Sequence, residues 1–163
     1  QALQDLRMAV DAIQPVNGNL AAVLATLRHR LQPRLAAAGL QLIWRVDDLP
    51  RLENLTPAMI QHTQRIVMEA FSNVIQYACA SKVLVRAQVV GLPFAAQQIR
   101  IRIADNGAGV STIPEAGQGL SNMRLRAETI GATLVWRSLG IPKLKLGGTS
   151  VCIDLPLTPP SRS

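Results

Sequence analysis

The sequence is poor in aromatic residues, in cysteine and in long hydrophobic runs, and each scarcity excludes a class of protein. Only 3% of the 163 residues are aromatic, which leaves few stacking platforms for binding single-stranded nucleic acid. Cys79 and Cys152, the two cysteines, have no CxxC spacing and are expected to be buried thiols rather than zinc ligands. The apolar stretches are shorter than the ~20 residues of a membrane-spanning helix. The length of the chain fits one domain with a short appendage.

Acidic residues are also few, 10 against 17 basic ones, which gives a formal net charge of +7. The arginines are scattered along the chain, so we do not expect a nucleic-acid interface. A basic surface that faces solvent, phosphates or an acidic partner domain is the expectation. The chain starts at Gln1 and not at Met, so we expect a piece of a longer protein, with any membrane anchor outside it.

Hydrophobic periodicity predicts helices that are separated by short alternating strands. Within the second helix, Asn17 is the expected cap and Pro33 an expected disturbance. Helices are expected over residues 1–13, 17–38, 57–78 and 119–130, and strands over residues 40–46, 83–89, 99–103, 133–138 and 150–155. This order indicates an α+β fold, a two-layer sandwich in which helices cover one face of a mixed sheet.

A carboxylate and an amide lie one helical turn apart, at Glu69 and Asn73. Residues i and i+4 share a helical face, so the two side chains point the same way. The carboxylate can orient or deprotonate a water or a hydroxyl, and the amide oxygen is a hard ligand that suits Mg²⁺. The alternative is a solvated polar pair at the edge of a core helix.

Three glycine-containing segments follow in the second half of the chain. In Asp105-Asn106-Gly107-Ala108-Gly109, a buried Asp can accept a hydrogen bond from an exocyclic amine, and the glycines let a flat base approach; the alternative is a tight turn. Gly117-Gln118-Gly119-Leu120 opens a helix whose N–H groups can face an anion, although it is neither a Walker A loop nor a Rossmann fingerprint. An ordinary helix start is the alternative there, and a plain turn is the alternative for Gly147-Gly148-Thr149.

In order and spacing these segments resemble the N, G1, G2 and G3 boxes of the GHKL ATPase superfamily, which includes sensor histidine kinases, DNA gyrase, a heat-shock chaperone family and mismatch-repair ATPases. The fit is closest to histidine kinases of the nitrate/nitrite-sensor type. Residues 69–78 (EAFSNVIQYA) are similar to their E-A-x-x-N-x-x-[KR]-H-A box, and residues 117–127 (GQGLSNMRLRA) to their G-x-G-L-x-x-M-R-x-R-A box. The resemblance covers about residues 40–156 and implies the Bergerat fold, with ATP under a lid at residues 110–116.

The resemblance implies a role for each matching residue. Glu69 would be the general base, Asn73 the Mg²⁺ ligand and Asp105 the partner of the adenine amine. Gln76 stands where the family has Lys or Arg, which removes a cation that could meet phosphate. The remaining ATP-binding positions would be Gln76 and Tyr77 on the helix, Gly107 and Gly109 at the base, Gly117, Gly119 and Leu120 at the phosphates, and Thr149 near the adenine.

The function implied is that of the catalytic domain of a two-component sensor histidine kinase. Such a domain transfers the γ-phosphoryl of Mg-ATP to a histidine on dimerisation helices, for relay to a response regulator. Neither His29 nor His62 is followed by an acidic residue, so the acceptor histidine is expected outside this chain. The alternatives are an anti-sigma-factor serine kinase and a degenerate module that binds nucleotide without kinase activity.

The resemblance also implies an organisation for the parent protein. Residues 1–38 would end the dimerisation helices, residues 39–157 would form the ATP-binding domain, and residues 158–163 would be a disordered tail. The parent would be a homodimer that can be anchored in the bacterial inner membrane. Its partners would be ATP, the phosphoacceptor helices and a response-regulator receiver domain. This part of it would be cytoplasmic, without membrane or nucleic-acid contact of its own.

Overall fold

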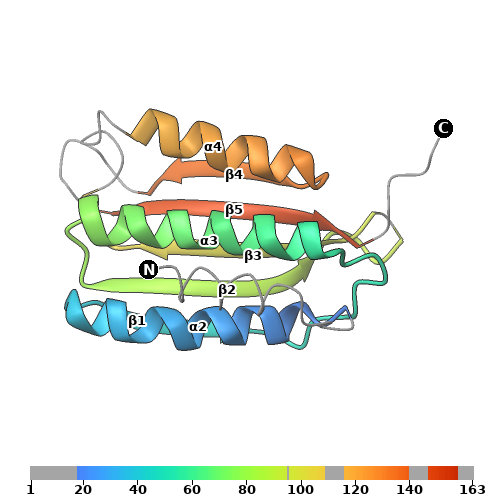
Figure 1. Cartoon of the computed structure of the whole chain (residues 1–163), viewed down its shortest axis with the longest axis horizontal. Helices are drawn as coiled ribbons and strands as arrows, with labels where there is room; N and C mark the ends of the chain where they lie inside the picture. Colours follow the sequence, from blue (N-terminus) through green and yellow to red (C-terminus); the bar gives the residue numbers. More distant parts are fainter. Residues whose placement is uncertain (1–17, 95, 109–115, 140–146, 158–163) are drawn as a thin grey trace, which may run out of the picture.

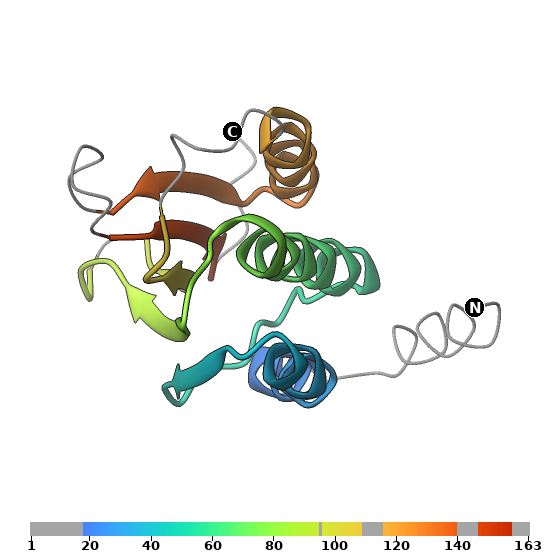
Figure 2. The ribbon, with the colours of Figure 1, turned by 90° about the vertical axis from the view of Figure 1, so that its left-hand side faces the viewer.

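The protein is an α+β sandwich in which three helices cover one face of a five-stranded sheet, as the sequence predicts (Figures 1 and 2). The computed structural model describes residues 18–94, 96–108, 116–139 and 147–157. The described helices are α2 (Leu20–Ala37), α3 (Pro57–Tyr77) and α4 (Ala116–Thr129). The strands are β1 (Gln41–Val46), β2 (Lys82–Val90), β3 (Gln98–Asp105), β4 (Thr133–Ser138) and β5 (Thr149–Pro156).

The sheet is mixed, with strand order β1-β2-β3-β5-β4. Strand β1 runs parallel to β2, and the other neighbouring pairs are antiparallel. Helix α3 connects the parallel strands β1 and β2, as a crossover of this kind requires. Strands β2 and β3 form the predicted hairpin, in which Val90 is the register partner of Gln98.

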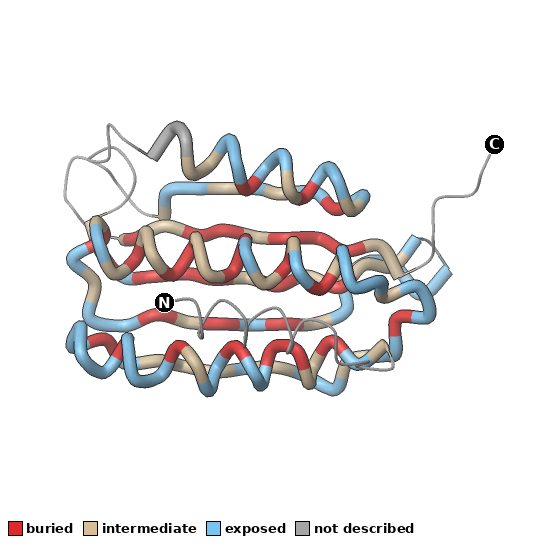
Figure 3. The backbone as a smooth tube through the Cα atoms, viewed as in Figure 1, coloured by how far each residue is buried: buried red, intermediate tan, exposed pale blue. Residues whose placement is uncertain are grey.

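Helix α2 packs onto the same core as the sheet. Its leucines recur at helical spacing, and Leu20, Leu27 and Leu31 are at most 1% exposed. Contacts join α2 to both α3 and β1, and Figure 3 shows its buried side against the neighbouring elements. The expected boundary at residue 38, between the dimerisation helices and the ATP-binding domain, therefore lies between elements that share one hydrophobic core. That residues 1–38 belong to the dimerisation helices of the parent protein stays a prediction.

The start of α2 differs from the expectation, and its end agrees with it. The cap is Asn19 and not Asn17, because the Asn19 side chain accepts a hydrogen bond from the Ala22 N–H at 3.1 Å. The helix continues through Pro33, the expected disturbance, and ends at Ala37, one residue before the expected end at residue 38. Pro33 is exposed, so water can satisfy the carbonyl that loses its N–H partner, while the buried leucines on the opposite side hold the helix.

Helix α3 crosses the middle of the sheet and is the element that positions one wall of the site. Thr56 caps it by accepting the Met59 N–H at 3.1 Å, and Pro57 follows in the first turn, as predicted. Ile66, Phe71 and Val74 are among its buried residues. Helix α4 lies beside it and buries Met123 and Ala127.

Helix α4 begins at Ala116, three residues before the predicted start at residue 119, so Gly117 and Gly119 fall in its first turn. Packing of α4 against α3 offsets the low helix propensity of these glycines.

The expectation that both cysteines are buried thiols is wrong, since Cys79 is exposed and Cys152 is only half-buried. The predictions for residues 1–17, for residues 110–115 of the lid and for the tail lie outside the described residues.

Candidate functional site

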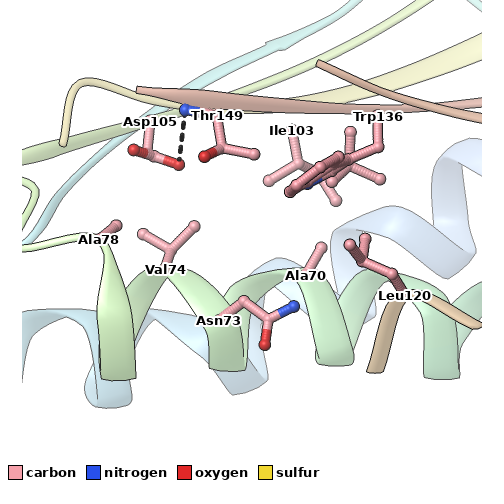
Figure 4. Close-up of a pocket in the computed structure, with 10 residues that line it drawn as sticks. Ala70, Asn73, Val74, Ala78, Ile103, Asp105, Leu120, Trp136 and Thr149 are labelled. Atoms are coloured by element: carbon pink, nitrogen blue, oxygen red, sulfur yellow. Dashed lines mark hydrogen bonds between the residues drawn. The ribbon is translucent and has the colours of Figure 1, made fainter. Parts of the chain in front are cut away.

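A pocket opens between helix α3 and the sheet, and most of its lining is apolar (Figure 4). It extends from Asp105 and Ala78 at one end to Trp136 and Leu120 at the other. The non-atom space within it is ≈ 420 Å³, including the part open to solvent. The lining residues are Ala70, Asn73, Val74, Ala78, Ile103, Asp105, Leu120, Trp136, Thr149 and Val151.

Asp105 is the charged group at the sheet end of this pocket. The alternation of β3 turns it to the helix-covered face, where its side chain is 7% exposed. Its Oδ1 accepts the Gly107 N–H at 2.8 Å, and its Oδ2 accepts the Thr149 N–H at 3.3 Å. Burial raises the pKa of the Asp105 carboxyl above its ordinary value, and the two backbone donors oppose this shift. The carboxylate is therefore held in a fixed orientation with its other lone pairs available to a ligand.

The turn after Asp105 is fixed by bonds to the end of α3 and the start of β2. Asn106 Oδ1 accepts the N–H groups of Ser81 at 3.0 Å and Lys82 at 2.9 Å. Ala108 donates its N–H to the Ala78 carbonyl at 2.8 Å. A Cβ at Gly107 would overlap that same carbonyl oxygen. The glycine is thus required by close backbone approach, which the sequence could not distinguish from hairpin geometry.

A second glycine, Gly148, lies in close contact with Asp105 just before the start of the neighbouring strand β5. A Cβ at Gly148 would overlap both the backbone and the side-chain oxygens of Asp105. This contact brings the segment before β5 against the end of β3 and sets the Thr149 N–H on the carboxylate. The segments that contain Asp105 and Thr149, 44 residues apart in the chain, thus form one end of the pocket.

Glu69 and Asn73 of α3 come together with α4 at Gly119. A Cβ at Gly119 would lie 2.7 Å from Glu69 Oε1 and 4.0 Å from Asn73 Nδ2. A larger residue there would displace the Glu69 carboxylate, so the glycine leaves room for this carboxylate beside α4. The carboxylate and the amide are both half-buried, and Asn73 also lines the pocket.

The structure brings most of the predicted site residues into one region. Four of them line the pocket: Asn73, Asp105, Leu120 and Thr149. Three others lie beside it: Gly107 is in contact with Ala78 of the lining, and Gly119 and Glu69 lie close to each other and to Asn73. Gln76 is exposed and Tyr77 is half-buried, and neither lines the pocket. Gly117 lies in the first turn of α4, and Gly109 is outside the described residues.

Sequence reasoning missed the apolar walls, above all Trp136. This residue lies on β4 opposite Val151 of β5 in register, and both face the helices. Leu134, Val135 and Trp136 of β4 are all apolar, so the sequence carried no alternation that would have singled out Trp136. Trp136 thus forms part of the pocket wall at the end where Leu120 lies (Figure 4).

The donor set suits Mg²⁺ only together with oxygens from a ligand. No cluster of three or more His, Cys, Asp or Glu that could hold a metal occurs among the described residues. Asn73 supplies a hard amide oxygen and Glu69 a carboxylate, and Mg²⁺ is commonly held by one or two such groups plus phosphates. These residues fit a metal that arrives with a nucleotide.

In the part of the chain that the structure describes, no helix has the length and apolar character to cross a membrane.

Comparisons with solved structures match this fold to histidine kinases. Histidine kinase AdeS of Acinetobacter baumannii superposes with a TM-score of 0.63 at 18% identity, covering 96% of this chain and 77% of that one. Full-length ShkA in complex with AMPPNP gives a TM-score of 0.64 at 18% identity, over 86% of this chain and 30% of that one. At these identities the likeness shows the fold.

Comparison of the sequence with curated proteins also finds a histidine kinase. The sensor histidine kinase LiaS of Bacillus subtilis is 25% identical over 161 residues, which is 98% of this chain and 41% of LiaS. The chain therefore spans about two-fifths of the length of this relative. The finer resemblance to the nitrate/nitrite-sensor type stays a prediction. A family model matches residues 59–159, more than half of the chain, and the chain thus belongs to the family described as histidine kinase-, DNA gyrase B-, and HSP90-like ATPase.

Proposed function

We propose that this chain is the ATP-binding catalytic part of a sensor histidine kinase. It would transfer the γ-phosphoryl of Mg-ATP to a histidine on dimerisation helices outside these residues, for relay to a response regulator. The observation that carries the proposal is the juxtaposition of Asp105 at one end of the pocket with Glu69, Asn73 and Gly119 beside the other. The packing of α2 into the core supports an ATP-binding unit that includes α2.

Within this proposal Asp105 receives the adenine. An ionised carboxylate has only acceptor sites, and the exocyclic amine of adenine is a donor. The Gly107 and Thr149 N–H groups orient the carboxylate, and the apolar walls of the pocket suit the faces of a flat base. Thr149 and Gly107 would bind the base edge.

The other end of the site would receive the phosphates. Asn73 would ligate Mg²⁺, Glu69 would orient or deprotonate the attacking group, and Gly119 and Leu120 would approach the phosphates from α4. Gly109, Gly117, Gln76 and Tyr77 remain proposed ATP-binding positions. Phosphoryl transfer depends mainly on positioning and charge stabilisation, which a site with one carboxylate and one bound metal can supply. The bound Mg²⁺ would neutralise charge on the phosphates.

The first test is calorimetric titration with a non-hydrolysable ATP analogue, with and without Mg²⁺. Binding should be stronger with magnesium, and Asp105→Ala should lose it. Asp47→Ala, which removes an exposed carboxylate on the β1 side, is the matched control and should bind as the wild type does. Equal affinity of both variants would refute the assignment of Asp105.

The second test separates transfer from binding. Glu69→Ala should keep most of the affinity but lose transfer to the dimerisation domain of the parent protein, supplied as a separate chain. Asn73→Ala, which removes the amide oxygen without adding charge, should weaken binding only when magnesium is present. Binding by the wild type without any transfer would identify the degenerate module, the alternative that Gln76 favours.

The proposal also predicts a pH dependence. Because burial raises the pKa of Asp105, protonation removes the acceptor at a higher pH than it would for an ordinary Asp. Affinity for the analogue should therefore be full above the raised pKa and fall as the pH drops through it. Asp105→Asn should bind weakly without this dependence. A wild-type affinity that stays constant down to the ordinary value of 3.8 would contradict the prediction.

A further inference from the structure

The face of the sheet opposite the helices holds a second hollow, which arginines line. Its polar lining comes from four strands: Arg86, Gln88, Arg100, Arg102, Arg137 and Ser150. The non-atom space within it is ≈ 810 Å³, including the part open to solvent. The strands that separate the two hollows carry their side chains alternately to one and to the other. A ligand in the second hollow would not enter the first.

Three arginines on this face stand in a row across neighbouring strands. Arg45 of β1 is the register partner of Arg86 in β2, and Arg86 is the register partner of Arg102 in β3. Register partners have side chains on the same face within a few ångströms of each other, and like charges in this position destabilise a sheet. Repulsion within the row therefore lowers the stability of the sheet, and a bound anion would remove this repulsion.

The positive charges on this face are only partly neutralised. Arg100 is paired with Asp154 through two contacts of 2.7 Å. Arg102 donates from Nε to Ser150 Oγ at 3.0 Å, which leaves its charge unbalanced. Arg86 and Arg137 are exposed and have no hydrogen-bond or ion-pair partner among the residues described. Among the described residues, nothing pairs with these two guanidinium groups, which border the hollow.

We propose that the hollow bordered by Arg86, Arg102 and Arg137 is a binding site for a small, multiply charged anion that bears phosphate groups. The planar fork of a guanidinium matches two phosphate oxygens at once, and such charge-assisted bonds are among the strongest that side chains make. Val135 and Leu139 form an apolar border to the site. Because the site is a hollow within the sheet face, it suits a small soluble anion. It lies on the opposite face from the proposed ATP pocket and does not depend on it.

Inorganic tripolyphosphate is the probe for this site, titrated by calorimetry into the whole chain. The wild type should bind it saturably. The double variant R86Q/R137Q should bind about tenfold more weakly per arginine removed, because one hydrogen bond to a charged group accounts for at least one power of ten in affinity. The control R51Q/R65Q removes the same charge from exposed positions outside the sheet and should bind as the wild type does.

Because tripolyphosphate could also enter the phosphate end of the proposed ATP pocket, the R86Q/R137Q variant separates the two proposals. It should weaken tripolyphosphate binding and leave unchanged the magnesium-dependent binding of the nucleotide analogue, which Asp105→Ala removes. Four results would overturn the proposal: no saturable binding, equal affinity of the wild type and R86Q/R137Q for tripolyphosphate, equal weakening in the R51Q/R65Q control, or binding to anionic phospholipid vesicles without binding to tripolyphosphate. A uniform loss with added salt in all variants would likewise mean bulk charge and not a site.

Discussion

The covered face and the open face of the sheet are built from alternate residues of the same five strands, yet they share almost no chemistry. Towards the helices, the middle of the sheet carries side chains such as Val85, Ile101 and Ile153, which are at most 1% exposed. Away from the helices the same strands carry Arg86, Arg102 and other cations. The pleat sends neighbouring residues to opposite faces, so each strand carries both patterns at once.

Each face has one feature that departs from the chemistry expected of such a surface, and those exceptions mark the candidate sites. Asp105 is the only charged strand residue on the covered face within the described part of the chain. On the open face, a row of like charges replaces the mixed signs that would stabilise a solvent-facing sheet. Departures from the chemistry of a surface thus indicate function better than the surface as a whole.

The largest effect is expected from truncating the covered face. Ile101 is fully buried between Ala87 and Ile153 in register, and Ile101→Ala should lower the free energy of unfolding by about 2–5 kcal/mol. Gln88→Ala, on the open face of the adjacent strand, should cost about 0.5 kcal/mol or less. Chemical denaturation measures both, and similar costs would mean that the two faces are equally packed.

Gly107→Ala should have the next largest effect, because the new methyl group would overlap the Ala78 carbonyl oxygen. Overpacking of this kind costs about 1–3 kcal/mol, and the displaced turn should also weaken binding of the ATP analogue. Gly39→Ala is the control, since Gly39 has a φ of +72° but no neighbour within 4 Å of its Cβ position. It should lower stability and leave nucleotide affinity unchanged. If both variants bind equally well, the turn does not shape the pocket.

Thr63→Val tests whether the covered side prefers apolar groups throughout. Thr63 is 0% exposed on α3, and its hydroxyl has no hydrogen-bond partner among the described residues. Replacing an unsatisfied hydroxyl with a methyl group of the same shape should leave stability unchanged or raise it by about 1 kcal/mol. Thr63→Ser keeps the hydroxyl and loses the methyl group, so it should be less stable than either. A Thr63→Val variant that is markedly destabilised would show that the hydroxyl is satisfied.

The sequence predicts these elements well where local periodicity decides them. Helix α3 has a cap, a proline in its first turn and a regular apolar stripe, and its bounds were predicted to within one residue. The start of α2 was harder to predict, because Asn17 and Asn19 are both of a residue type that caps helices. The start of α4 was placed too late, since tertiary packing against α3 holds its glycines in a helix.

The candidate site was predictable in its polar residues but not in its walls. Asp105 and Thr149 could be singled out by their glycine neighbours, but their contact depends on the pairing of β3 with β5. Trp136 enters the pocket through the register of β4 with β5, which no local pattern specifies. Register is set by the whole sheet, so residues contributed by a distant strand were the ones missed.

Arg86→Thr should produce the smallest effect, and its sign is informative. Arg86 stands between Arg45 and Arg102 in register, so removing it relieves two repulsive pairs, and threonine suits a strand. Stability should rise by about 0.2–1 kcal/mol, the range of single cross-strand pairs, and the gain should shrink in high salt. Gln88→Thr on the same strand faces a single cation in β3, Arg100, which Asp154 already neutralises, so its effect should not depend on salt. A loss of stability in Arg86→Thr would mean that the row is already compensated in the free protein, and the open face would then be an ordinary solvated surface.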